Sequence, residues 1–193
     1  MRTVPRWLSG STESLAGVFA REGFRQARME ELAAAAGVPR ATLYYHFSGK
    51  DEVLAWLLRS TLADLRAAVE EAVAGAGDAS RRLRAVLRAQ VGLMGRHPAA
   101  CRVLLANLDR AGHLPDIAAG VAEAFHDPVA QLLVEGVADG SLRRVDDPAR
   151  TAGVVFGAVT IAALQALVVD PVFQPEAVAA AVLDVVLTGL EGR

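Results

Sequence analysis

Basic, aromatic and hydroxyl side chains crowd into residues 39–50, the stretch of the sequence best suited to chemistry with another molecule. Its polar members are Arg40, Thr42, Tyr44, Tyr45, His46 and Lys50. Arginine can donate a pair of hydrogen bonds to guanine O6 and N7. Hydroxyl and ammonium groups bind phosphate oxygens, which positions a protein on a nucleic acid without reading its sequence. The combination predicts a DNA-contacting segment, whereas any one of these side chains alone is more often a surface or packing residue.

Two short helices separated by a glycine are expected to position this segment. One apolar helix face repeats at intervals of three and four residues and comprises Met29, Leu32, Ala33 and Ala36. Gly37 can adopt the left-handed conformation that ends a helix. In the helix that follows, Leu43 and Phe47 are four residues apart and form a buried side. The opposite side presents the polar set together with Ala41, and this arrangement is a helix-turn-helix.

Position within the motif predicts what each side chain contacts. Arg40 stands in the first turn of the second helix, where the side chains of a recognition helix reach base edges. Ala41 is small enough to let the helix lie deep in the groove and to contact a thymine methyl group. Lys50 opens the next helix, where exposed N–H groups add to its charge in holding a phosphate.

Charge is unevenly distributed along the chain. Its 193 residues carry 20 Lys and Arg against 22 Asp and Glu, for a formal net charge of −2. Residues 1–50 hold seven basic and four acidic side chains, a net charge of +3, so the remaining residues sum to −5. The near-neutral total argues against a histone-like or ribosomal coating protein, and 53% hydrophobic residues exclude a disordered chain. The excess positive charge lies at the end that holds the helix-turn-helix, as expected if only that end meets a polyanion.

Helix-forming residues dominate the sequence and strand alternation is absent, so the predicted fold class is all-α. Glycine and proline breaks divide the chain into about nine helical segments. We expect a helix-turn-helix domain over residues 1–50 and a larger helical body over residues 51–193. One long helical segment, about residues 50–74, joins the two without a flexible linker.

The cysteine count and the apolar segments predict the compartment. Cys101 is the only cysteine, so no intramolecular disulfide can form, and a reducing, cytoplasmic location is the natural interpretation. Residues 1–10 contain no apolar stretch of signal-peptide length. Residues 153–169 are strongly apolar but fall short of the roughly 20 residues that span a bilayer. A buried interface helix is therefore favoured over a membrane span, and no membrane partner is expected.

The sequence around the predicted helix-turn-helix resembles the DNA-binding domain of the TetR (tetracycline-repressor) family. The resemblance covers about residues 11–58 and rests on Phe19-Ala-Arg-Glu-Gly23-Phe24, Leu32-Ala33, Ala36-Gly37-Val38 and the run from Thr42 to Lys50-Asp-Glu. It implies a homodimeric transcriptional regulator, usually a repressor of a palindromic operator, whose larger body binds a small molecule. It also implies that Arg40, Ala41 and Tyr44 lie near bases and that Thr42, Tyr45, His46 and Lys50 lie near phosphates.

Two departures from the family pattern fall within the helix-turn-helix. Ala27 and Arg28 stand where threonine or serine usually caps the first helix of the motif. Arg28 can supply charge to a phosphate but cannot cap, so this helix start is expected to be weaker. Pro39 stands where serine or threonine is common, and it suits a first helical turn but donates no hydrogen bond. Arg28 and Pro39 complete the set of predicted DNA-facing residues.

No catalytic or metal-ligand pattern stands out in the body, so no enzyme activity, metal or cofactor is expected. The last two helical segments are predicted to pair with their two-fold mates in a dimer, through Val154, Gly157, Ile161, Leu164, Val178, Val182, Val185 and Val186. The alternative is that they are buried against the chain's own body. Pocket candidates are Leu65, Met94, Cys101, Leu104, Asn107, Leu108, His113, Phe125, His126, Phe156, Thr160 and Gln165. They lack clustered charge, which favours a mostly apolar or neutral ligand.

Two other functions stay open at this level. A regulator without a small ligand, such as an activator or a co-regulator, would need no internal cavity. An all-helical enzyme or ligand carrier could reuse the same scaffold, although no sequence feature favours it.

Overall fold

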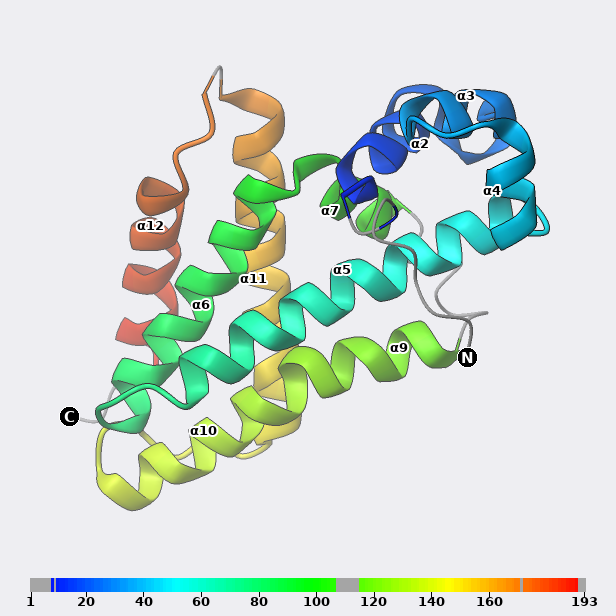
Figure 1. Ribbon diagram of the computed structural model, residues 1–193. Coiled ribbons are helices and arrows are strands. Elements are labelled where there is room, and N and C mark those ends of the chain that lie inside the picture. The colour runs from blue at the N-terminus through cyan, green and yellow to red at the C-terminus, as the bar shows by residue number, and fades with distance from the viewer. Residues whose placement is uncertain (1–7, 9, 107–114, 171, 191–193) are drawn as a thin grey trace. The chain divides into compact units, whose positions relative to one another are not determined.

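The computed structural model describes residue 8 and residues 10–106, 115–170 and 172–190. The elements in these ranges are helices, so the all-α prediction is confirmed (Figure 1). The chain divides into two compact units, of which the first comprises residues 1–61 and 97–117 and the second residues 62–96 and 118–193. Two helices contribute residues to both units, α5 (Lys50–Val73) and α9 (Pro115–Val121).

The first unit includes a helix from much later in the sequence. α7 (Pro98–Ala106) packs against α2 (Thr12–Gln26). The Glu13 carboxylate of α2 accepts hydrogen bonds from the N–H groups of Ala99 and Ala100, at 2.8 and 3.3 Å. N–H groups in a first helical turn have no partner inside their own helix, so Glu13 caps α7. The two compact units therefore differ from the two domains predicted by a single boundary after residue 50. That boundary between a DNA-binding domain and a larger body stays a prediction.

The helix-turn-helix consists of α3 (Met29–Ala35) and α4 (Arg40–His46), both in the first unit. Leu32 and Leu43 are fully buried, and Phe47 is 5% exposed. The apolar faces predicted for the two helices therefore anchor them in the core of the unit, which leaves the other side of α4 outside.

The turn between α3 and α4 is a Schellman motif. The N–H groups of Gly37 and Val38 donate to the carbonyls of Ala34 and Ala33, each at 3.1 Å. Gly37 has a φ of +69°, a conformation that costs free energy for a residue with a Cβ. Because these two hydrogen bonds satisfy the last carbonyls of α3, they fix the direction in which the chain leaves for α4.

The second unit is a helical bundle formed mainly by α6 (Ala79–Arg96), α10 (Asp127–Asp139), α11 (Pro148–Val169) and α12 (Pro175–Thr188). α6 contacts α10, α11 and α12. The largest fully buried side chains of the unit are Leu83, Leu87, Phe125, Leu132, Leu133 and Leu187. A π-helix, η1 (Ala122–His126), joins α9 to α10 with helical backbone angles at both ends. α9, η1 and α10 thus form one continuous helical segment with a π-helical stretch, a feature that is frequent at functional sites.

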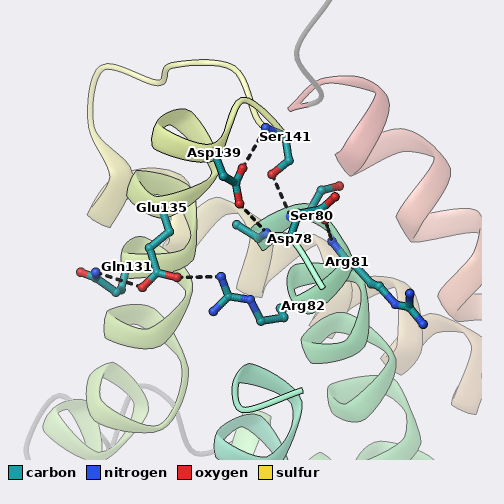
Figure 2. Close-up of polar contacts among 9 residues, drawn as sticks. Asp78, Ser80, Arg81, Arg82, Gln131, Glu135, Asp139 and Ser141 are labelled. Carbon is teal, nitrogen blue, oxygen red and sulfur yellow. Dashed lines mark hydrogen bonds and ion pairs between the residues drawn. The ribbon is translucent and has the colours of Figure 1, made fainter. Parts of the chain in front are cut away.

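A tight return after α10 brings two polar side chains to the start of α6. A Cβ added to Gly136 would lie 2.4 Å from the buried side chain of Leu142, so only glycine permits this approach. The first three N–H groups of α6 then donate to Asp139 Oδ2, Ser141 Oγ and Asp78 Oδ1, at 2.9, 3.2 and 2.8 Å (Figure 2). Each of these groups lacks a partner within α6, so Asp139 of α10, Ser141 of the following turn and the preceding Asp78 complete the helix start.

The same contacts lower the pKa values of two carboxylates. Hydrogen bonds from the Ser141 side chain and from the backbone N–H groups of Ala79 and Ser141 lower the pKa of Asp139. Hydrogen bonds from Gln131 and Arg82 lower the pKa of Glu135, and the Arg82 guanidinium lies 2.8 Å from its carboxylate (Figure 2). A carboxylate whose pKa is lower in the folded state stabilises the fold above its ordinary pKa. That stabilisation is lost as the pH falls through the lowered value.

Asp139→Asn is therefore expected to lower the Tm by a few degrees at pH 7, with a difference from wild type that shrinks toward pH 3. The amide loses one acceptor oxygen and the charge, whereas the wild-type carboxylate loses its own charge in acid. Thermal unfolding followed by circular dichroism between pH 3 and 8 measures the difference. Asp146→Asn removes the same charge from an exposed aspartate and should unfold like wild type. A difference that is constant with pH would contradict the expectation.

α11 is the one helix in the described ranges long and apolar enough to cross a bilayer, by length and composition only. Length and composition are weak evidence for a membrane span, because core helices of soluble proteins pass the same test. One side of α11 contacts α6, α10 and α12. Packing in the bundle buries 28% of its most apolar stretch, so it accounts for only part of the apolar character of α11.

Candidate nucleic-acid interface

α4 presents most of the predicted DNA-facing residues on its outer side. The exposed members are Pro39, Arg40, Ala41, Tyr44 and Tyr45, and the half-buried ones are Thr42 and His46. Tyr44 and Tyr45 are 43% and 67% exposed. Their hydroxyls are suitable donors to phosphate oxygens. The structure places this set on one short, well-anchored helix, and its contact with DNA stays a prediction.

Arg40 is held by two neighbours. Its Nη1 atom lies 2.6 Å from Oε1 of Glu30, a residue in the first turn of α3. Its Nη2 atom lies 3.5 Å from the Tyr44 hydroxyl oxygen, and its Cζ atom lies 5.2 Å from the centroid of the Tyr44 ring. Tyr44 and Glu30 raise the pKa of Arg40 further, so the guanidinium stays charged. Sequence reasoning missed Glu30, whose only signal was an acidic residue close before the recognition helix.

Lys50 contacts the end of a helix instead of pointing freely into solvent. Its Nζ atom donates to the carbonyl oxygens of Arg25 and Ala27, at 2.7 and 3.2 Å, and lies 5.0 Å from the centroid of the Phe24 ring. The last carbonyls of α2 have no helical partners, and a cation is favourable there. Lys50 therefore stabilises the C-terminal end of α2, a role that its sequence position did not predict. Its phosphate contact stays a prediction.

A polar cleft of about 560 Å³ adjoins Lys50 in the first unit. It is lined by Glu22, Arg25, Gln26, Ala27, Arg28, Glu31 and Lys50. Arg28 makes no side-chain cap to α3, as expected of a group that only donates. Glu31 compensates in part, because its carboxylate accepts the Arg28 N–H at 3.0 Å, which is half of a capping box. Three basic side chains against two acidic ones leave the cleft with a net positive charge, which suits the binding of a phosphate backbone.

The second unit brings three of the predicted pocket residues together. The Phe156 ring lies 5.1 Å from that of Phe125 and 5.4 Å from that of His126, measured between centroids. Phe125 and His126 both belong to η1. Burial lowers the pKa of His126, so its imidazole is neutral at pH 7. Its Nε2 atom is buried without a hydrogen-bond partner.

A buried amide of α6 bonds to α11 at Thr160, one helical turn beyond Phe156. Gln90 is 3% exposed, and its Nε2 atom donates to Thr160 Oγ1 at 2.8 Å. Its Oε1 atom is buried and has no partner. Sequence reasoning named Thr160 but missed Gln90, although an amide between Leu87 and Met94 on an apolar helix face was a usable signal. Leu65 and Met94, also predicted, are buried in the same unit.

The other pocket candidates are not brought to this place. Cys101 and Leu104 are buried in the first unit. Burial raises the pKa of the Cys101 thiol to about 12, which keeps it protonated and makes it a poor nucleophile. Gln165 is exposed on α11, so its assignment to an interior pocket is wrong. Asn107, Leu108 and His113 lie outside the described residues.

The predicted dimer residues lie mostly on the outer sides of α11 and α12. Val154, Ile161 and Val185 are 67%, 60% and 75% exposed. The half-buried ones are Gly157, Leu164, Val178 and Val186. Val182 is 7% exposed and packs in the core of its own unit, so its assignment to a dimer surface is wrong. We call the exposed apolar set Val154, Ala158, Ile161, Val168 and Val185 the outer stripe.

Known proteins match both the helix-turn-helix and the whole fold. Residues 13–56 match the family model for bacterial regulatory proteins of the tetR family. The fatty acid metabolism regulator protein of Bacillus subtilis is 22% identical over 181 residues, which cover 91% of each chain. The TetR-family regulator PfmR from Thermus thermophilus is 25% identical, with a TM-score of 0.80 over 95% of this chain and 98% of that one. The structure of FadR from Bacillus subtilis in complex with stearoyl-CoA is 20% identical, with a TM-score of 0.78 over 95% and 97% of the two chains.

The family match falls on the segment that the structure folds as a helix-turn-helix, with its polar face outward. The named relatives are transcriptional regulators and not enzymes, which agrees with the expectation of a non-enzyme. Residues 13–56 are therefore a helix-turn-helix segment of the tetR type, and the chain as a whole has the fold of TetR-family transcriptional regulators.

Proposed function

We propose that the protein is a homodimeric repressor that binds a palindromic operator in the cytoplasm and leaves it when an apolar acyl ligand enters the body. The observation that carries the proposal is the outer face of α4, where Arg40, Tyr44 and Tyr45 are exposed on a helix fixed by a Schellman turn. A recognition helix reads bases with its N-terminal residues, and Arg40 is the first residue of α4. The three basic residues of the neighbouring cleft suit contact with the phosphate backbone.

The outer stripe supports the dimer. Several exposed valine and isoleucine side chains on two neighbouring helices are the kind of apolar surface that monomers rarely leave in water. Gly157 has no atom of this chain within 4 Å of the position a Cβ would take, so its side of α11 is open to a second helix. A two-fold dimer presents two recognition helices, which favours a palindrome with half-sites about 34–36 Å apart.

The interior of the second unit favours a ligand whose buried part is uncharged. Its buried polar side chains among the described residues are Ser80, Gln90 and Thr160, none of them ionisable at neutral pH. His126 is held neutral by burial. A carboxylate buried there would lack a compensating charge, whereas a thioester carbonyl needs only a hydrogen bond. Since the related FadR structure holds stearoyl-CoA, long-chain acyl-CoA is the first ligand class to test.

Stearoyl-CoA is expected to weaken operator binding by about 5–150-fold, the usual range of allosteric coupling. Free stearate and free CoA should do less, because one lacks an uncharged thioester and the other lacks an acyl chain. Fluorescence anisotropy measures the affinity for a labelled operator, which is obtained by selecting duplexes from a randomised pool with the wild-type protein. A scrambled duplex serves as the control DNA.

The possible results separate the parts of the proposal. Failure to select any palindrome at low salt would contradict the operator function. Tighter binding in the presence of stearoyl-CoA would make the ligand a co-repressor. An unchanged affinity with every acyl-CoA length tried would reject this ligand class and favour a regulator of another kind.

A further inference from the structure

We propose that Glu30 is a specificity-determining residue that makes Arg40 favour guanine over the phosphate backbone. The inference rests on the proposed function, in which Arg40 lies at a base edge of the operator. It concerns a carboxylate in the helix before the recognition helix, where a negative charge is unfavourable for binding DNA in general.

The geometry fixes the plane of the Arg40 guanidinium. Glu30 reaches across the turn from α3 and lies 2.6 Å from Nη1. Tyr44 lies one turn along α4, with its ring centroid 5.2 Å from Cζ and its hydroxyl 3.5 Å from Nη2. The side chains of Arg40 and Glu30 are 59% and 51% exposed, and an ion pair this exposed contributes little to stability. Its main consequence is for what Arg40 can bind.

Guanine and phosphate make different demands on this pair. Guanine O6 and N7 are uncharged acceptors, and a guanidinium has five N–H donors, so Arg40 can bind guanine while it keeps Glu30. A phosphate oxygen is charged and is repelled by the Glu30 carboxylate. To bind a phosphate, Arg40 must leave Glu30 and expose that carboxylate to the polyanion. Glu30 therefore weakens the contact of Arg40 with phosphate, which any DNA sequence provides. It leaves the contact of Arg40 with guanine, which depends on the sequence.

Glu30→Gln keeps the length of the side chain and its acceptor oxygen but removes the charge. It should strengthen binding to a scrambled duplex by about 3–10-fold and change operator affinity by less than about threefold, so the ratio of the two affinities falls. The salt dependence on the scrambled duplex should become steeper, because Arg40 is released to bind a phosphate. Anisotropy titrations on both duplexes at several salt concentrations measure these quantities.

Glu70→Gln is the matched control. Glu70 lies 2.7 Å from Arg66 in the second unit, and these side chains are 60% and 56% exposed, so the substitution removes an equivalent ion pair away from α4. It should leave the affinity ratio unchanged. In an Arg40→Ala background, Glu30→Gln should no longer change the ratio, because the pair no longer exists. Thermal unfolding of each variant verifies that the fold is retained.

An affinity ratio that Glu30→Gln changes no more than Glu70→Gln does would overturn the inference. So would a parallel loss of affinity for both duplexes, which would make Glu30 a structural residue. If the wild-type protein itself binds operator and scrambled DNA equally, the proposed function fails and the inference fails with it. A preserved wild-type preference with an unchanged ratio in the variant refutes the inference alone.

Discussion

Val185→Asp should convert the proposed dimer into a monomer and lower operator affinity by more than about 100-fold. Val185 is 75% exposed on α12, so an aspartate there costs the isolated chain little. In a two-fold interface the same substitution buries two like charges without partners, and each uncompensated buried charge costs about 3–5 kcal/mol. A single helix-turn-helix then has to bind one half-site of the operator alone, which removes most of the affinity.

Size-exclusion chromatography with light scattering gives the mass at micromolar concentration, and anisotropy gives the operator affinity. Val134→Asp is the matched control, because Val134 is 51% exposed on α10 and lies outside the outer stripe. It should remain dimeric and bind the operator like wild type. A Val185→Asp variant that stays dimeric, or a wild-type protein that is monomeric, would rule out the assignment of the interface to α11 and α12.

Arg40→Ala should lower operator affinity by about 10–100-fold, since a bidentate arginine–guanine contact discriminates by about 1–3 kcal/mol. Binding to the scrambled duplex should change by less than about threefold, because Glu30 already restrains Arg40 from phosphates. When the guanine opposite Arg40 is replaced in the operator, the wild-type protein loses the same contact. On that duplex the affinities of Arg40→Ala and wild type should therefore differ less than on the original operator. Anisotropy on the operator, its single-base variants and the scrambled duplex measures all three.

Arg28→Ala provides the comparison with a phosphate contact. Arg28 is exposed and lines the polar cleft beside Lys50, so its loss should weaken operator and scrambled binding alike and reduce the salt slope by about 1. Lys50→Ala is a poorer comparison, because it also removes the hydrogen bonds to the end of α2. Equal effects of Arg28→Ala and Arg40→Ala on the affinity ratio would contradict the division of roles.

Local features of the sequence were enough to predict the helix-turn-helix. A glycine at the end of one apolar face and a pair of apolar residues four apart define two helices and their turn within twenty residues. Each of these signals depends only on residues close together in the sequence. The Schellman hydrogen bonds at Gly37 are likewise made between residues at most five apart. The outward polar face of α4 follows in turn, because Leu43 and Phe47 must be buried.

Contacts between distant parts of the sequence were not predictable in this way. Gln90 and Thr160 are 70 residues apart, and Asp139 caps a helix that begins 60 residues earlier. Periodicity also fails where both sides of a helix are apolar, as in α11 and α12. One side packs in the bundle and the other is exposed, and hydrophobicity alone does not distinguish them. For this reason the sequence predicts the wrong side for Val182.

The cap that Glu13 supplies to α7 limits how the N-terminal DNA-binding part of the chain, here called the head, can be transferred to another protein. A head excised at residue 61 would keep α2, α3 and α4 but lose α7, the helix that α2 packs against. The excised fragment would expose an apolar surface and leave the Glu13 carboxylate without its two N–H donors. The head is therefore not a portable module defined by a contiguous stretch of sequence. A chimera that grafts this DNA specificity onto another body needs a helix equivalent to α7, with a first turn that Glu13 can cap.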